Sequence, residues 1–207
     1  MRIVIISDTH TQHEKLGRLS GDVLIHCGDS ANGFKRSPDD VRKLDDWFGQ
    51  QDFDRILCTG GNHDFEMENL SGAGTPVLRN AEFLQDRSLH HRGIHFYGAP
   101  WTPELAGWAF YLPALEMRDK WALIPNQVDV LITHTPPAGI LDRNRSGRSC
   151  GCPDLAERLL DLRPRLHCFG HVHASAGTVE RDETTYVNAS MVNSQYQIAH
   201  RPHAFDL

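Results

Sequence analysis

After Met1 the chain reads Arg2-Ile3-Val4-Ile5-Ile6-Ser7-Asp8-Thr9-His10, an apolar run that ends abruptly in polar side chains. The run is continuous rather than alternating, which is typical of a strand covered on both faces. Similar runs follow at 22–27, 54–59, 128–133 and 165–170, and further strands are expected at 94–98 and 184–189. Each of the five runs ends in Gly, Asp, Asn or His. The sequence therefore predicts buried strands whose ends carry polar groups.

Helical segments are predicted between these strands. Ser37 is expected to cap a helix with Pro38 at its first position and acidic residues in its first turn. One face of this helix is apolar and consists of Val41, Leu44, Trp47 and Phe48. Residues 112–123 and 153–162 have similar patterns, the latter with Leu155, Leu159 and Leu162 facing inward. Strands that alternate with helices predict a layered α/β fold, with functional sites at the carboxyl ends of the strands.

Composition restricts the class of protein. The 207 residues suffice for one large domain, and because there is no internal repeat or linker, residues 1–207 are treated as a single domain. A net charge of −6 argues against extended nucleic acid or an anionic membrane as partner. No apolar run approaches the roughly 20 residues of a membrane span. The first apolar run is too short for a signal peptide, and five dispersed cysteines suit reduced thiols, so a cytoplasmic location is expected.

Five polar clusters follow or end predicted strands, and they contain several of the 13 histidines. The clusters are Asp8-Thr9-His10, Gly28-Asp29, Gly60-Gly61-Asn62-His63-Asp64, Thr133-His134-Thr135-Pro136-Pro137 and Gly170-His171-Val172-His173. Each cluster alone has an ordinary explanation, such as a turn or a helix cap. Polar side chains that converge on one edge of a sheet need partners, however, and a metal site provides them.

The ordered set of clusters resembles the calcineurin-like metallophosphoesterases, whose pattern is Asp-x-His, Gly-Asp, Gly-Asn-His-Asp/Glu, a lone His and Gly-His-x-His. The match runs without a gap from Asp8 to His173. Residues 98–103, 108–110, 139–142 and 187–190 are similar to the small single-domain branch that includes the brain metallophosphoesterase-domain proteins and bacterial relatives. The resemblance implies a four-layer αββα sandwich, in which two mixed sheets are flanked by helices.

The resemblance also implies a site for two divalent metal ions. One ion would be held by Asp8, His10, Asp29 and His173, and the other by Asp29, Asn62, His134 and His171, so that Asp29 bridges them. His63 would lie just outside the metals, near the substrate phosphate. Asp64 is grouped with His63 as a catalytic residue, either because it orients His63 or because it caps the helix that follows.

These residue types suit phosphoester hydrolysis. One carboxylate can join two cations about 3.5–4 Å apart, and two divalent ions with two carboxylates leave a net charge of about +2. A metal-bound hydroxide, formed near pH 7, would attack phosphorus in line with the leaving oxygen, to which His63 would donate a hydrogen bond or a proton. Mixed imidazole and carboxylate ligands suit Mn²⁺, which is expected here, and also Fe, Ni or Zn, better than Mg²⁺.

The expected function is a metal-dependent phosphodiesterase that hydrolyses small phosphodiesters such as cyclic nucleotides. The alternatives are a phosphomonoesterase of the same fold or a non-catalytic metal-binding scaffold. Ser30-Ala31-Asn32-Gly33 follows Asp29, without the Arg-Gly continuation typical of serine/threonine protein phosphatases. The expected partner is a small phosphoester, with nucleotides among the candidates, and the expected assembly is a monomer or homodimer.

Several residues have two interpretations. The segment 136–152 contains three arginines that form either a phosphate contact or a solvated charge run: Arg143, Arg145 and Arg148. Four aromatic residues form either a wall that stacks on a nucleobase or part of the core: Trp101, Trp108, Phe110 and Tyr111. Cys150 and Cys152 are a weak signal for a soft metal. His26 and His167 are expected to be packed within strands, and the surface is expected for His90, His91, His200 and His203.

Overall fold

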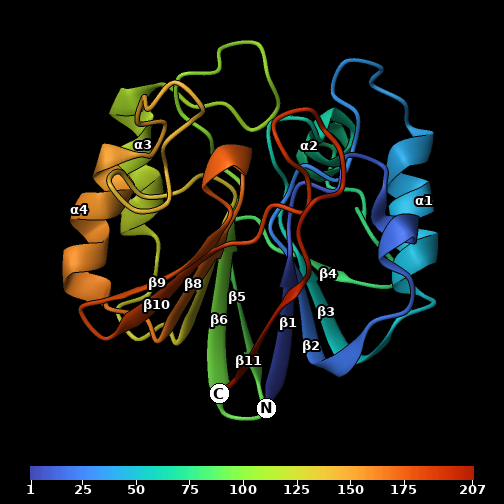
Figure 1. The fold of residues 1–207 in the computed structure, drawn as a ribbon, viewed down its shortest axis with the longest axis horizontal. Coiled ribbons are helices and arrows are strands. Elements are labelled where there is room, and N and C mark those ends of the chain that lie inside the picture. The colour runs from blue at the N-terminus through green and yellow to red at the C-terminus, as the bar shows by residue number, and fades with distance from the viewer.

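The computed structural model describes residues 1–207, and in it the strands form two sheets that lie face to face (Figure 1). The first sheet has the strand order β11-β1-β2-β3-β4. Its strands are β1 (Arg2–Ile6), β2 (Ser20–His26), β3 (Asp52–Cys58), β4 (Glu82–Phe83) and β11 (His203–Asp206). Strands β1 to β4 are parallel, whereas β11 runs antiparallel to β1.

The second sheet has the order β5-β6-β7-β8-β10-β9. It consists of β5 (Arg87–His91), β6 (Ile94–Ala99), β7 (Val130–Thr133), β8 (Leu166–Phe169), β9 (Gly177–Arg181) and β10 (Thr184–Asn188). The four central strands are parallel, and the edge strands β5 and β9 are antiparallel to their neighbours. Both sheets are therefore mixed.

Alternation along the central strands separates two layers of core. Ile3 and Ile5 of β1 belong to the apolar layer between the sheets, which also contains Phe96 and Ile132 of the second sheet. Val4 of β1 belongs instead to the layer that packs against the helices. Both faces of each sheet are therefore buried, which explains why the sequence shows continuous rather than alternating apolar runs.

Four helices cover the outer faces of the sheets (Figure 1). Helices α1 (Asp39–Phe48) and α2 (Phe65–Gly72) lie beside the first sheet, and α3 (Ala114–Ala122) and α4 (Pro153–Leu162) lie beside the second. Two short 3₁₀ turns, His13–Leu16 and His173–Ser175, complete the elements. None of the helices is long and apolar enough to cross a membrane. The expected αββα sandwich of two mixed sheets flanked by helices is confirmed.

The structure differs from the sequence prediction in details. Helix α1 begins at Asp39 after Pro38, and no side chain caps it, so the predicted Ser37 cap is wrong; Ser37 contributes its carbonyl to the Asp40 amide instead. Helix α3 is shorter than predicted. The short or edge strands β4, β5, β9 and β11 were not predicted, because they are half exposed and polar and depend on pairing with distant neighbours.

The two sheets meet at the end where the predicted polar clusters lie. Ser7, directly after β1, forms a parallel bridge with Ser190, two residues after β10, and the Met191 amide donates to the Ser7 carbonyl over 2.8 Å. The N- and C-termini lie together at the opposite end, where the Met1 amine donates to the Leu207 carbonyl (Figure 1). This junction brings loops from both sheets to one edge.

Candidate metal centre

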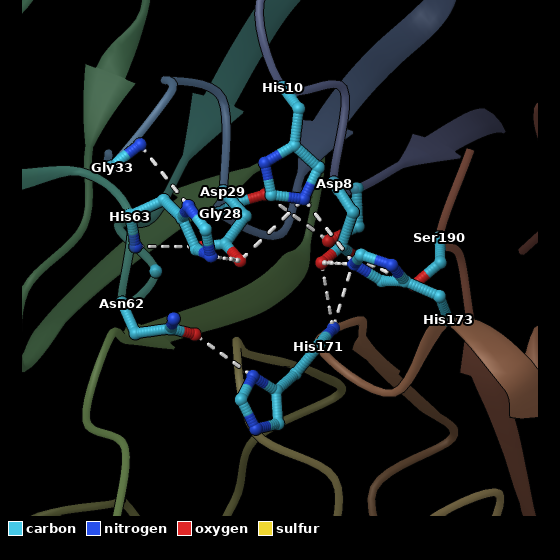
Figure 2. Close-up of polar contacts among 12 residues, drawn as sticks. Asp8, His10, Gly28, Asp29, Gly33, Asn62, His63, His171, His173 and Ser190 are labelled. Carbon is cyan, nitrogen blue, oxygen red and sulfur yellow. Dashed lines mark hydrogen bonds and ion pairs between the residues drawn. The ribbon is translucent and has the colours of Figure 1, made fainter. Parts of the chain in front are cut away.

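Asp8 anchors the first part of the site, in the loop after β1. Its carboxylate accepts the Ser190 hydroxyl at 2.7 Å and the backbone amide of His171 at 3.0 Å. Both partners come from the second sheet, so this one carboxylate ties the two sheets together at the site. Figure 2 shows Asp8 between His10 and His173.

Asp29, in the loop after β2, is the centre of the cluster. Its Oδ1 accepts the backbone amide of His63 at 2.8 Å. Its Oδ2 lies 3.4 Å from Nε2 of His134 and 3.9 Å from Nε2 of both His10 and His63. One carboxylate oxygen thus faces three imidazoles that come from three different loops.

The ligand atoms divide into two groups that share Asp29. One group contains Asp8, His10, Asp29 and His173, the other Asp29, His134 and His171, and in each the ligand atoms lie within 4.8 Å of one another. Asn62 joins the second group, because its Oδ1 lies 2.9 Å from Nδ1 of His171 and 3.1 Å from Nε2 of His134. The structure thus brings together all seven residues of the predicted metal set, in the predicted division.

The protonation of these histidines tests whether the site suits cations. The Nδ1–H of His134 donates to the Cys27 carbonyl over 2.8 Å, so its Nε2 points at acceptor oxygens of Asp29 and Asn62. Nδ1 of His10 similarly lies 3.3 Å from the Ala31 carbonyl, while its Nε2 lies 3.3 Å from Nε2 of His173. Backbone carbonyls that orient histidines in this way are typical of metal sites. Acceptors that face one another need a proton or a cation between them, so the donor set fits divalent ions.

The pKa values show how strongly these groups interact. Burial lowers and the Asp29 carboxylate raises the pKa of His134, and the carboxylate prevails, so the pKa rises to about 9. Burial raises the pKa of Asp29, but the nearby imidazoles of His134, His63 and His10 hold it well below its usual value. Burial dominates at His10, where it lowers the pKa to about 4. Asp29 is therefore ionised and His10 neutral, which are the forms that bind metals, whereas His134 holds a proton that a cation would displace.

The backbone of the site is strained. Asp8, His10, Asp29 and His171 all have positive φ angles, of 53°, 42°, 56° and 68°. This region is uncommon for residues other than glycine and costs on the order of 1 kcal/mol or more per residue. Two glycines admit the crowded side chains: a Cβ on Gly61 would lie 2.4 Å from Asp29 Oδ1, and one on Gly170 would lie 2.1 Å from Asp8 Oδ2. The conformation that holds the ligands together therefore lowers the stability of the folded protein.

His63 lies at the edge of the centre, outside both ligand groups. The backbone amide of Gly33 donates to its Nδ1 over 3.2 Å, so the neutral ring carries its proton on Nε2, which faces Asp29. Its ring also contacts Trp108 and the largely exposed Phe34, with centroids 4.8 and 5.5 Å away (Figure 2 shows His63 with Gly33). Burial lowers the pKa of His63 below its usual value, so the Nε2–H form prevails at neutral pH.

Asp64 lies at the N-cap position of α2, as one of its predicted roles requires, but its side chain bonds elsewhere. Its carboxylate accepts the backbone amides of Asp29, Ser30, Ala31 and Gly61 and the Ser30 hydroxyl, at 2.8 to 3.0 Å. It neither bonds to the His63 ring nor caps α2 with its side chain. Burial and the Asp29 charge raise the pKa of Asp64 to about 6. Asp64 therefore shapes the loop that presents Asp29.

The remaining candidates divide between site and core. Arg145 and Cys150 line a pocket of about 470 Å³ that opens onto the centre, together with His63, His171 and His173. Trp101 and Phe110 are buried in the core, and so are Cys27, Cys58 and Cys152, whereas Trp108 and Tyr111 are half-buried. No second pair of metal-ligating side chains accompanies Cys150 and Cys152.

The histidines outside the motifs mostly follow expectation. His26 and His167 are fully buried within strands and bond to threonine hydroxyls, which confirms that they are packed rather than ligands. His90 is exposed; His91, His200 and His203 are half-buried, so the surface prediction holds fully only for His90.

Sequence reasoning missed three residues that line or support the site. Tyr196 packs on His10 and His173, with ring centroids 4.7 and 5.2 Å away, Phe34 packs on His63, and Ser190 bonds to Asp8. Only Ser190 had a signal, because it lies in one of the stretches that carried the resemblance. Tyr196 and Phe34 lie in loops with no pattern of their own.

Comparison with known proteins supports the same assignment. The family model of the calcineurin-like phosphoesterases matches residues 1–175. Metallophosphoesterase domain-containing protein 1 of Homo sapiens is 35% identical, over 100% of this chain and 71% of its own length. The UPF0046 protein K07C11.7 of Caenorhabditis elegans is also 35% identical, over 99% of this chain and 74% of its own.

A solved structure shows the same fold at lower identity. The phosphopantetheinyl hydrolase PptH of Mycobacterium tuberculosis superposes with a TM-score of 0.60 at 16% identity, over 94% of this chain and 90% of that chain. The family match covers the loops that carry every candidate ligand. This chain belongs to the calcineurin-like phosphoesterase family of metal-dependent phosphoester hydrolases.

Proposed function

We propose that this protein is a phosphodiesterase that hydrolyses small phosphodiesters, cyclic nucleotides among them, with two divalent cations, Mn²⁺ in the first place. Asp8, His10, Asp29 and His173 hold one cation, and Asp29, Asn62, His134 and His171 hold the other. When bound, such a pair of cations supplies an acidic water and positive charge for the phosphoryl oxygens. Asp29, the one carboxylate shared by both groups, would be a ligand of both cations.

The observation that carries the proposal is the orientation of His63. Because the Gly33 amide occupies Nδ1, the proton of the neutral ring is on Nε2 and faces the space beside Asp29. A phosphodiester has an alkoxide leaving group, on which negative charge develops as its bond to phosphorus breaks. The Nε2–H of His63 donates a hydrogen bond to this oxygen and stabilises its charge, while water supplies the proton, and Gly33 keeps the donor nitrogen turned toward the substrate.

Asp64 acts as a positioning residue in this proposal. Through its five hydrogen bonds it fixes the backbone on both sides of Asp29 and at Gly61, next to Asn62. It therefore determines where the shared carboxylate and the amide ligand lie, without touching the substrate.

The protein has an aromatic surface beside His63 that can receive the alcohol portion of the substrate. Phe34 and Trp108 stand perpendicular to each other, with ring centroids 5.4 Å apart, and Phe34 is 73% exposed. An exposed aromatic side chain next to this hydrogen-bond donor suits a nucleobase, which gains stacking energy there.

The proposal is tested with the His63→Ala variant and two phosphodiesters. We expect kcat to fall about 10²-fold or more for an alkyl ester, and much less for a nitrophenyl ester, because nitrophenolate is a stable anion that depends less on the hydrogen bond from His63. Metal content, measured on the same samples, stays at the wild-type level. His90→Ala, an exposed histidine far from the motifs, is the matched control. Equal losses on both esters, or loss of metal from His63→Ala, would contradict the role of His63.

A further inference from the structure

A tight loop at the rim of the pocket presents one arginine in a fixed place. Arg143 and Ser149 form an antiparallel bridge, and within it the Asn144 amide donates to the Arg148 carbonyl over 3.0 Å. Oδ1 of Asn144 accepts the amides of Ser146 and Arg148, at 3.0 and 3.1 Å. The loop is therefore closed by its own hydrogen bonds, with Arg145 at its tip.

The base of this loop is attached firmly to the body of the protein. Asp142 is buried, and its carboxylate accepts the Gly139 amide and the Ser149 hydroxyl. The Ser175 hydroxyl donates to the Arg143 carbonyl and accepts the Arg143 amide. Ser175 follows the ligand His173 by two residues, so the position of the loop is tied to that of the metal centre.

The three arginines of the loop differ in what they bind. Arg143 donates to the Gly147 carbonyl at 2.7 Å, and Arg148 pairs with Glu104 at 3.1 Å. Arg145 has neither an acidic partner nor a side-chain hydrogen bond, although it lines the pocket. Two of the arginines are thus used within the protein, and the guanidinium of the third is free for a ligand.

The charged residues of the pocket indicate what kind of ligand Arg145 can bind. Apart from the histidines, its only charged lining residues are Arg145 and Asp29, and Asp29 is 2% exposed whereas Arg145 is exposed. The centre, with two divalent ions and two carboxylates, has a net charge of about +2, which a hydroxide and one phosphodiester monoanion neutralise. Arg145 therefore adds a positive charge that a simple phosphodiester does not match, and it does so at the rim, away from the buried metal ligands.

Tyr196 borders the same pocket, between the metal centre and Arg145. Its ring suits the part of a substrate that would connect the phosphodiester to a second anionic group. Its ring lies against His10 and His173, and its backbone carbonyl accepts the Gln12 side-chain amide at 2.8 Å. This half-exposed aromatic ring provides a flat apolar surface on the way from the metal centre to the pocket rim.

We propose that Arg145 binds a second anionic group of the substrate, a phosphate or a carboxylate carried by its alcohol portion. The inference rests on the proposed phosphodiesterase function and deepens it: within that class, esters with a second acidic group bind more tightly than esters with one, such as simple cyclic nucleotides. Guanidinium binds both oxyanions through paired N–H donors. Phosphate and carboxylate are distinguished by the experiment.

The test compares three nitrophenyl phenyl phosphates, in which the phenyl ring carries no charge, a carboxymethyl group or a phosphonomethyl group. In Arg145→Gln we expect KM to rise about tenfold for an ester whose phenyl ring carries an acidic group, and to remain unchanged for the ester with the unsubstituted ring. The ester with the larger rise identifies the anion. Arg145→Lys restores part of the affinity, and Arg148→Gln, an exposed arginine of the same loop, is the matched control. The effect of Arg145→Gln decreases as salt concentration rises.

A binding measurement separates failure of this inference from failure of the proposed function. Calorimetry on the Mn²⁺-loaded protein compares methylphosphonate with propane-1,3-diphosphonate, neither of which is hydrolysed. We expect the wild type to bind the diphosphonate more tightly than methylphosphonate, and Arg145→Gln to bind the two ligands about equally. This difference is expected even if no diester is turned over. An equal loss for all ligands, or no change in Arg145→Gln, would overturn the inference.

Discussion

Oδ2 of Asp64 accepts the backbone amide of Asp29 at a distance of 2.8 Å. The same oxygen accepts the Gly61 amide, and Oδ1 accepts the amides of Ser30 and Ala31. A residue from the loop after β3 thus determines the conformation of the loop after β2. The shared carboxylate of the metal centre is held by a second carboxylate that binds only backbone amides and one hydroxyl.

The Asp64→Asn variant tests this relationship. Because Asn has one acceptor oxygen and one donor nitrogen, at least two buried amides lose their acceptor. Each such loss costs on the order of 1–3 kcal/mol, so we expect the free energy of unfolding to fall by about 2 kcal/mol or more. Affinity for Mn²⁺ falls as well, because Asp29 loses its fixed position.

Urea unfolding with a chelator present measures the stability of the metal-free variant, and titration with Mn²⁺ measures its affinity. Asp46→Asn, on the exposed face of α1, is the control and is expected to change both quantities little. Wild-type stability together with wild-type metal affinity in Asp64→Asn would show that these five hydrogen bonds do not hold Asp29.

The close packing at Gly61 gives a second prediction. A Cβ at this position lies 2.4 Å from Asp29 Oδ1 and 2.5 Å from the Asp29 amide nitrogen, so Gly61→Ala must displace Asp29. We expect Gly61→Ala to be purified with less than half of the wild-type metal content. Gly72→Ala, where a Cβ meets nothing within 4 Å, is the matched control. Full metal content in Gly61→Ala, measured by elemental analysis, would mean that Asp29 is not needed in its observed position.

Trp108 gives a prediction about substrate preference. If its ring stacks on a nucleobase, Trp108→Ala raises KM for a cyclic nucleotide about tenfold and leaves KM for bis(nitrophenyl) phosphate within about twofold. Phe34→Ala is expected to act in the same direction, because Phe34 contacts both Trp108 and His63. Steady-state kinetics on both substrates decides the matter. Parallel losses on the two substrates would indicate that Trp108 supports His63 rather than a base.

His167 predicts how stability depends on pH. Its Nε2–H donates to the Thr133 hydroxyl at 2.9 Å, its Nδ1 has no partner, and burial lowers the pKa of the ring to about 3. Between this value and the unfolded value of 6.5, the unfolded chain binds a proton that the folded protein excludes. Stability is therefore full above pH 6.5 and falls as the pH drops, by about 2 kcal/mol at pH 5 from this residue alone.

The prediction is checked by urea unfolding of metal-free protein between pH 5 and pH 7.5, with His167→Gln as the comparison. Glutamine keeps a donor near the position of Nε2 and does not titrate. We expect the free energy of unfolding of His167→Gln to depend less steeply on pH, with a slope that corresponds to about one proton fewer taken up on unfolding. An unchanged slope would show that His167 is not the source of the acid sensitivity.

Local patterns sufficed for the framework of this protein. Continuous apolar runs such as residues 2–6 depend only on burial of both sheet faces, and Asp8, Asp29 and His134 directly follow such runs. Strand ends at one edge of a sheet are necessarily close, so the polar clusters were expected to meet, whereas the division of their side chains between two metal ions came from the family resemblance. Edge strands such as β9 and β11 have no such signal, because pairing with a neighbour, not their composition, makes them strands.

The amino-acid sequence by itself determined the layered fold and, through its ordered motifs, the seven candidate ligands and the place of the buried His63 beside them, because these motifs stand where buried strands stop. Only the tertiary structure decided the roles of Asp64, Arg145 and Tyr196. Their partners lie far away in the sequence: the Tyr196 carbonyl is bonded by Gln12, 184 residues earlier. Contacts of this kind leave no periodicity or motif behind, since they exist only after two separate sheets have packed together and brought their loops to a common edge.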